Sequence, residues 1–180
     1  MLPIFVPGGE LWDERNEEMI YTKPTQLRLE HSLISISKWE SKWHVSFFDT
    51  KKNEEQTMSY IRCMSLNPDV DPNVFYRLTR KDLSAINEYI EDPMTASTIR
   101  EVEGGRRHGN ERITSELIYY WMIQFGIPVE FEKWHINRLI MLIRICSEKN
   151  KPAKKMSQSD IAARYRAINN ANRAKFHTKG

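Results

Sequence analysis

The stretch Ile118–Cys146 reads IYYWMIQFGIPVEFEKWHINRLIMLIRIC and is interrupted once, by the tripeptide GIP at 126–128. Glycine commonly ends one helix and proline commonly begins the next. The interruption therefore predicts two helices, the second running from about Val129 to Lys149. Two helices joined by so short a turn form an antiparallel hairpin. We expect this central helical hairpin, at about 113–149, to hold the core of a small domain.

A membrane hairpin is the first alternative for this stretch. A span needs about 20 consecutive apolar residues, and the apolar run Ile118–Val129 is shorter than that and contains Gln124. The second half also carries charged residues along its length, including Glu132, Arg138 and Arg144. Such residues are costly at the centre of a bilayer. The sequence therefore favours a core of soluble helices and no membrane partner.

A metal or catalytic site is the second alternative. Glu132 and His135 have the E-x-x-H spacing of helical di-iron sites, but those sites need two such motifs and the chain has one. Asp69 begins a pattern like that of a calcium loop, but Val74 and Arg80 stand where glycine and glutamate are required. The chain also lacks a phosphate-loop ending and a G-x-S-x-G motif. We predict no enzyme activity, cofactor or metal, although residues distant in sequence can still converge in a fold.

The first third of the sequence predicts a small β unit at residues 1–31. PIFVP is bounded by proline at both ends, as edge strands are, and the next apolar segments flank a polar turn near 13–17. TQLRLEHS alternates apolar and polar residues with the period of a half-buried strand. From Ser32 the apolar residues follow a helical period instead. We expect the chain to change there from strand to helix, which gives an α+β, predominantly α-helical fold.

Residues 32–150 predict the helical part, so that 1–150 form one domain, followed by a C-terminal arm at 151–180. A chain of 180 residues can bury a core without disulfides. Cys63 and Cys146 lie in apolar helical runs with no partner at zinc spacing, which indicates reduced, buried thiols. The residues that we expect in the structural core are Trp39, Trp43, Tyr120, Trp121, Phe125, Trp134, Leu139 and Leu142.

Charge is distributed unevenly along the chain. Residues 144–180 carry ten lysines and arginines against two acids, so this segment contributes +8 to a net charge of +3 and the rest carries −5. The basic arm ends in a predicted helix that has a thin apolar stripe. Such an arm suits an acidic partner, either protein or nucleic acid. The residues that we expect to contact such a partner are Lys149, Lys151, Lys154, Lys155, Arg164, Arg166, Arg173 and Lys175.

Several longer phrases carry a resemblance. They are LRLEHSLISISKWESKW, YIRCMSL, YIEDPMTAST, NKPAKKMS and the segment from ITSEL through LIRIC. Together they resemble a family of small proteins encoded in the tail-gene block of long-tailed bacteriophages and prophages, over nearly the whole chain. The family is similar to the tail assembly chaperones encoded next to the tape measure protein. The resemblance implies a protein without enzyme activity that binds the tape measure protein and tail tube subunits in the host bacterial cytoplasm.

Two other functions stay open. A compact α+β domain with a charged arm also suits a structural virion protein, such as a tail-completion, neck or baseplate component. DNA binding as a packaging accessory is a weaker alternative. The arm supplies charge for phosphate contacts, but no helix-turn-helix, zinc finger or RNA-binding motif can be aligned. A homo-oligomer is compatible with each of these functions.

Overall fold

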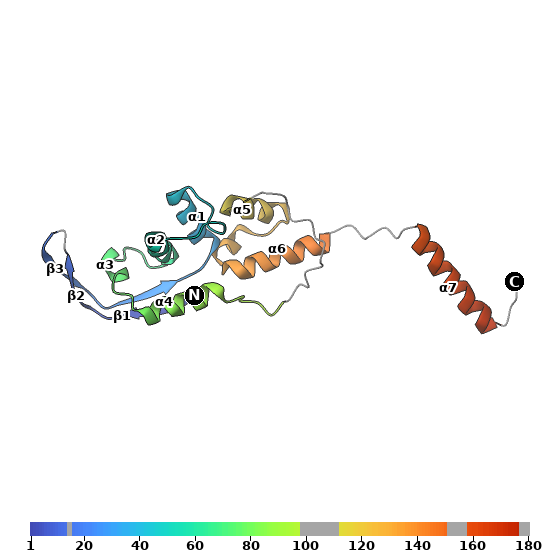
Figure 1. The fold of residues 1–180 in the computed structure, drawn as a ribbon, viewed down its shortest axis with the longest axis horizontal. Coiled ribbons are helices and arrows are strands. Elements are labelled where there is room, and N and C mark those ends of the chain that lie inside the picture. The colour runs from blue at the N-terminus through green and yellow to red at the C-terminus, as the bar shows by residue number, and fades with distance from the viewer. Residues whose placement is uncertain (14–15, 98–111, 151–157, 177–180) are drawn as a thin grey trace. The chain divides into compact units, whose positions relative to one another are not determined.

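The computed structural model describes residues 1–13, 16–97, 112–150 and 158–176 (Figure 1). The chain divides into two compact units, Met1–Glu148 and Lys149–Gly180. The first unit begins with four short antiparallel strands and continues with helices, so the expected α+β, predominantly helical fold is confirmed. Within the described residues, no helix is long and apolar enough to cross a membrane.

The four strands form one long two-stranded ribbon. They are β1 (Leu2–Val6), β2 (Gly9–Asp13), β3 (Glu18–Thr22) and β4 (Thr25–Leu29). β1 pairs with β4 and β2 pairs with β3 in the same continuous register, so β2 and β3 extend the ribbon beyond the body of the unit (Figure 1). That register would place Pro7 opposite Pro24. Neither proline has an N–H to donate, so the hydrogen-bond ladder is interrupted between the two halves.

Only the half of the ribbon formed by β1 and β4 contributes to the core. Ile4, Val6, Leu27 and Leu29 are buried on one of its faces, whereas Phe5 on the other face is exposed. The segment at Leu66 covers part of the free edge of β4. Leu66 N donates to Arg28 O at 2.8 Å. In the outer half, Trp12, Met19 and Tyr21 are all exposed.

The change from strand to helix occurs at Ser32, as the sequence predicts. Ser32 has extended backbone angles and its side chain accepts from the backbone N–H of Ser35, while the Ser35 hydroxyl accepts from the N–H of Ser32. Such reciprocal capping satisfies two donors at the helix start. The first helix, α1 (Leu33–Trp43), then buries Leu33, Ile36 and Trp39.

Three further helices follow α1 and lie around the half of the ribbon that β1 and β4 form. They are α2 (Glu54–Met64), α3 (Pro72–Phe75) and α4 (Arg80–Glu91). Asn53 caps α2 and Thr79 caps α4, each with a side chain at the third helical position returning the hydrogen bond. Between α3 and α4, the Arg77 guanidinium donates to Gly8 O at 3.2 Å and to Thr22 Oγ1 at 3.0 Å. Arg77 therefore braces the ribbon where its own ladder is broken.

The second half of the predicted helical hairpin differs from the prediction. α5 (Ser115–Gln124) ends at Gly126, which has a left-handed φ of 63°. A 3₁₀ turn, η1 (Val129–Lys133), follows, and α6 (Ile136–Asn150) begins only after a break. The prediction of one helix from Val129 to Lys149 was wrong. The backbone at Trp134–His135 is extended because His135 forms a β-bridge with Ser32 and Ile136 N donates to His31 O at 2.7 Å.

The predicted core residues divide into three groups. Trp39 and Leu139 are fully buried, while Trp43, Trp121 and Phe125 are half-buried against the core. Leu142 and Trp134 are also half-buried. Placing Tyr120 in the core was wrong, because its side chain is 53% exposed. Ile118 and Met122 are buried on one face of α5. Tyr120 is two residues from each and lies on the opposite face.

The second unit contains α7 (Gln158–Phe176), a helix with no buried residue. Its larger apolar side chains, Ile161, Tyr165, Ile168 and Phe176, are all exposed. Residues 161, 165 and 168 share one helical face by their spacing. α7 therefore carries an apolar stripe that its own unit leaves uncovered.

Candidate functional site

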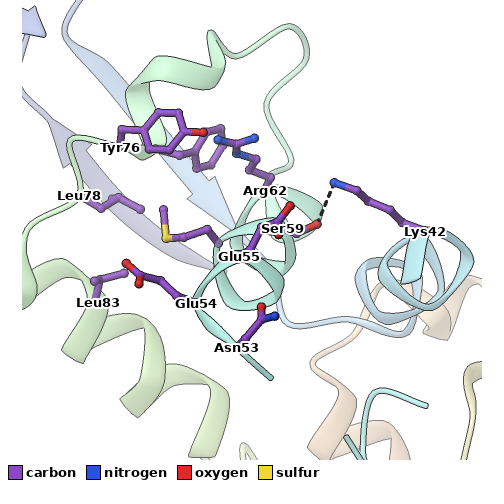
Figure 2. A pocket seen from close by; sticks show the side chains of 11 residues that line it. Lys42, Asn53, Glu54, Glu55, Ser59, Arg62, Tyr76, Leu78 and Leu83 are labelled. Carbon is purple, nitrogen blue, oxygen red and sulfur yellow. Dashed lines mark hydrogen bonds between the residues drawn. The ribbon is translucent and has the colours of Figure 1, made fainter. Parts of the chain in front are cut away.

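A groove of about 640 Å³ lies over α2, within the first unit (Figure 2). This volume is in the range of ligand-binding pockets in proteins. Three elements besides α2 contribute to it: the end of α1, the segment from α3 to α4, and the start of α4. We call this feature the α2 groove. Its lining residues are Lys42, Asn53, Glu54, Glu55, Met58, Ser59, Arg62, Phe75, Tyr76, Leu78 and Leu83.

The floor of the α2 groove is one face of the helix. Glu55 lies three and four residues before Met58 and Ser59, and Arg62 lies four and three residues after them, which places all four on one face of α2. The acids lie in the first turn and Arg62 lies in the last turn. This arrangement complements the dipole of α2 and stabilises the helix. It also makes the groove acidic at one end and basic at the other.

Arg62 is the unusual residue of the groove. It reaches from α2 toward Tyr76 (Figure 2), and its guanidinium carbon lies 5.0 Å from the Tyr76 ring centroid and 5.8 Å from that of Phe75. Its Nε is buried and has no hydrogen-bond partner among the described residues. A buried N–H without an acceptor costs about 1–3 kcal/mol. The two rings hold the guanidinium in place while leaving one of its donors unused.

The opposite wall of the groove is polar and internally bonded. Lys42 Nζ, from α1, donates to Ser59 Oγ at 3.3 Å (Figure 2), and Trp43 Nε1 donates to the same oxygen at 3.1 Å. Lys42 Nζ also lies 5.5 Å from the Trp43 ring centroid. These contacts fix the wall against the floor, so the groove is built into the packing of α1 on α2.

A second polar cluster lies inside the core. The His31 Nδ1 bonds with the Tyr60 hydroxyl, which also lies 3.3 Å from Ser35 Oγ. The ring centroids of His31 and His135 are 5.0 Å apart. Burial, with contributions from His135 and Lys52, lowers the pKa of His31 to about 3. His31 is therefore neutral at ordinary pH.

Burial also lowers the pKa of His135, against the opposing effect of its hydrogen bond to the Tyr89 carbonyl. Its Nε2 lies 2.9 Å from the Tyr89 carbonyl oxygen and donates to it, and its Nδ1 accepts from Asn137 N at 3.3 Å. The Nδ1 lone pair thus caps the start of α6, which a protonated ring cannot do. The cluster joins β4, α1, α2, α4 and α6, and its polar groups are used in holding these elements together.

The residues considered as metal ligands have other roles. Glu132 Oε2 accepts from the Tyr119 hydroxyl at 2.8 Å, which ties η1 to α5, and His135 caps α6. Asp71 caps α3 through the N–H of Asn73 at 2.9 Å. No group of three or more His, Cys, Asp or Glu side chains suited to a metal ion occurs in the parts of the chain that the structure describes. Cys63 and Cys146 are free and half-buried.

The expected partner-binding residues are only partly visible. Arg164, Arg166, Arg173 and Lys175 lie exposed on α7, and Lys149 lies exposed in the last turn of α6. Lys151, Lys154 and Lys155 fall outside the described residues. The four basic residues on α7 therefore share a helix with its uncovered apolar stripe, whereas Lys149 does not.

The α2 groove was not predicted from the sequence. The row of Glu55, Ser59 and Arg62 on the polar side of α2 is visible in the sequence, but it reads as an ordinary solvated face. The wall residues from Phe75 to Leu83 follow the end of α2 by 11 to 19 residues, and Lys42 precedes its start by 12, so that only folding brings them together. No protein-family model, curated protein or solved structure matches the chain.

Proposed function

We propose that the protein is a bacteriophage tail morphogenesis protein without enzyme activity, a tail assembly chaperone that binds the tape measure protein and tail tube subunits in the host cytoplasm. The resemblance over nearly the whole chain supports the choice of family. The observation that carries the proposal is α7, whose apolar stripe is exposed along a helix that also displays Arg164, Arg166, Arg173 and Lys175.

The chemistry of α7 suits binding to another protein. A helix of 19 residues is about 28 Å long, and an amphipathic helix of this kind binds by laying its apolar face on a partner. Arg166 and Arg173 add positive charge beside the stripe, which favours a partner with acidic side chains. Long helical proteins with exposed apolar seams offer such a surface before they assemble.

The proposal is tested by co-expressing the chain with the tape measure protein of the same phage. We expect a soluble complex with the full chain and loss of tape-measure solubility when residues 149–180 are deleted. A full-length variant with Tyr165→Ala and Ile168→Asp should lose the complex as well. Lys51→Glu with Lys133→Glu, two exposed changes in the first unit, is the matched control. If deletion of the arm leaves the complex and the solubility unchanged, α7 is not the binding element.

A structural virion protein is the second candidate. It is favoured by the outer half of the ribbon, where Trp12, Met19 and Tyr21 are exposed on adjacent paired positions of β2 and β3. Exposed aromatic and methionine side chains are enriched in permanent protein interfaces. Mass spectrometry of purified virions separates the two functions, because an assembly chaperone is absent from the finished particle and a structural component is present.

A further inference from the structure

We infer that the α2 groove is a docking site for one amphipathic helical segment of a partner protein, which presents a carboxylate to Arg62 and a basic side chain to Glu54 and Glu55. The inference rests on the proposed function only in taking the partner to be a helical protein. It concerns a surface on the first unit that is separate in sequence from α7.

The apolar part of the groove suits the side chains of a helix. Met58 lies in the middle of the α2 row, and Leu78 and Leu83 face the groove beside it (Figure 2). The residues of α2 that line the groove run from Glu54 to Arg62, which corresponds to about 12 Å along the helix axis. Two to three turns of a second helix cover that length. A helix lying in an apolar groove is a recurrent mode of peptide recognition.

The charges at the two ends determine what the helix must carry. Arg62 has a buried Nε without an acceptor in the described part of the chain, and its guanidinium is fixed by two aromatic rings. Guanidinium groups bind carboxylates with two parallel hydrogen bonds, so a carboxylate in the groove pairs with the outer nitrogens of the Arg62 guanidinium. At the other end, Glu54 and Glu55 are exposed acids that attract a basic side chain.

The order of these charges also sets the direction of the partner helix. Acids are favoured in the first turn of a helix and bases in the last turn. A partner with that order places its acid at Arg62 only when it runs antiparallel to α2, because Arg62 lies in the last turn of α2. The site is therefore specified for an antiparallel segment with an acid first, an apolar stripe, and a base about two turns later.

The test uses labelled helical peptides of about 15 residues and measures binding by fluorescence anisotropy. The probe peptide has an apolar stripe, with a glutamate and a lysine seven residues apart, the separation of Glu55 and Arg62. The comparison peptide has glutamine in place of the glutamate, and a third has lysine there. We expect the wild-type protein to bind the glutamate peptide about tenfold more tightly than the glutamine peptide, since one charge-assisted hydrogen bond contributes about that factor.

Charge reversal in the protein identifies the contact. Arg62→Glu should bind the glutamate peptide at least about tenfold more weakly and should prefer the lysine peptide instead. Arg144→Glu, an equal change at an exposed position outside the groove, is the matched control and should keep the wild-type preference. Thermal melts of both variants show whether they remain folded, and the reversed preference of Arg62→Glu cannot arise from an unfolded chain.

The inference is overturned if the wild-type protein binds the glutamate and glutamine peptides equally, or binds neither at about 1 mM, the limit of weak association. It is also overturned if Arg62→Glu keeps the wild-type preference. The peptides contain no phage sequence, so a negative result removes the groove inference and leaves the arm-deletion experiment to decide the proposed function separately.

Discussion

Glu40 and Arg62 are two charged side chains of the same helical unit, one buried and the other half-buried, and they differ in how the fold uses their polar atoms. Glu40 is buried in α1, and its carboxylate accepts from Phe47 N at 2.8 Å and from Ser115 N at 2.7 Å. Arg62 in α2 packs against two rings but has a buried Nε with no acceptor among the described residues. One charge is used completely within the fold, and the other is not.

This difference separates residues that build the fold from residues available to a partner. Glu40 connects α1 to the loop after it and to the first residue of α5, so its charge lies at the positive end of the α5 dipole. Arg62 connects no two elements through a hydrogen bond within the described chain. A buried donor that the fold leaves unused requires an explanation, and its position in the α2 groove indicates binding. The following changes test that separation.

Of the changes to these two charged residues, replacing Glu40 should have the larger effect on stability. Glu40→Ala leaves the buried N–H groups of Phe47 and Ser115 without an acceptor, at about 1–3 kcal/mol each. We expect the free energy of unfolding to fall by about 2–5 kcal/mol, measured by urea denaturation. Glu40→Gln keeps one carbonyl acceptor and should lose less. Glu130→Ala, an exposed acid on η1, should change stability by less than about 0.5 kcal/mol.

A loss below about 1 kcal/mol for Glu40→Ala would mean that water or a shifted backbone satisfies both N–H groups. In that case the contrast with Arg62 disappears, because both charges would be dispensable to the fold. The Gln variant distinguishes charge from geometry: equal losses for Ala and Gln would show that the negative charge at the start of α5 is what matters.

Acid should be the next strongest perturbation. The pKa of His31 falls from 6.5 to about 3 on folding, so the unfolded chain binds more protons below pH 6.5. Stability is therefore complete above pH 6.5 and is lost as the pH falls toward 3, by about 1.4 kcal/mol per pH unit for this one group. Urea midpoints measured from pH 7 to pH 4 give the slope. The lowered pKa of His135 acts in the same direction.

The variant His31→Asn should be less stable at pH 7 and should lose less stability on acidification than the wild-type protein. His44→Asn, at the exposed residue that ends α1, is the matched control for replacing a histidine outside the buried cluster. If His31→Asn and the wild-type protein have the same slope, His31 already titrates near its ordinary pKa in the folded state.

The sequence predicted the parts of the fold that depend on local pattern. The change from strand to helix at Ser32 follows from residue type and period alone, and it occurs. The break at His135 did not follow, because it depends on pairing with Ser32, about a hundred residues earlier in the chain. A continuous apolar pattern was therefore taken as one helix.

The candidate site was even less accessible from sequence. The α2 groove exists because α1, α2 and the segment from α3 to α4 meet in space, and no local pattern encodes that meeting. Tyr120 was misplaced for a related reason. α5 is only 10 residues long and apolar on nearly every face, so periodicity could not distinguish its buried side from its exposed side.

Removing Trp134 should have a moderate effect. A fully buried tryptophan in the core would contribute about 3–5 kcal/mol to stability, but Trp134 is half-buried. Its ring stacks on Phe131 with 4.0 Å between the ring centroids, and the Arg138 guanidinium carbon lies 4.1 Å from the Trp134 ring centroid. An aromatic pair contributes about 0.5–1.5 kcal/mol and a cation–π contact about 0.5–1. We therefore expect Trp134→Ala to lower the free energy of unfolding by about 1–2 kcal/mol.

Trp39→Ala is the matched comparison for Trp134→Ala, because Trp39 is fully buried and its Nε1 donates to Gln56 O at 2.9 Å. It should lose about 3–5 kcal/mol in the same urea experiment. If the two tryptophan variants lose equal amounts, the stack of Trp134 on Phe131 is as much a part of the core as Trp39.

Arg62→Met should have the smallest effect on stability and is the sharpest test of the contrast with Glu40. Methionine preserves much of the apolar stem and removes the buried Nε that has no acceptor in the described residues. Loss of the contacts with Tyr76 and Phe75 opposes that gain by about 1 kcal/mol. We expect a net change within about 0.5 kcal/mol, measured by urea denaturation at pH 7. A loss above about 2 kcal/mol would place Arg62 with Glu40 among the residues that build the fold, and the groove would then have a structural arginine at its basic end.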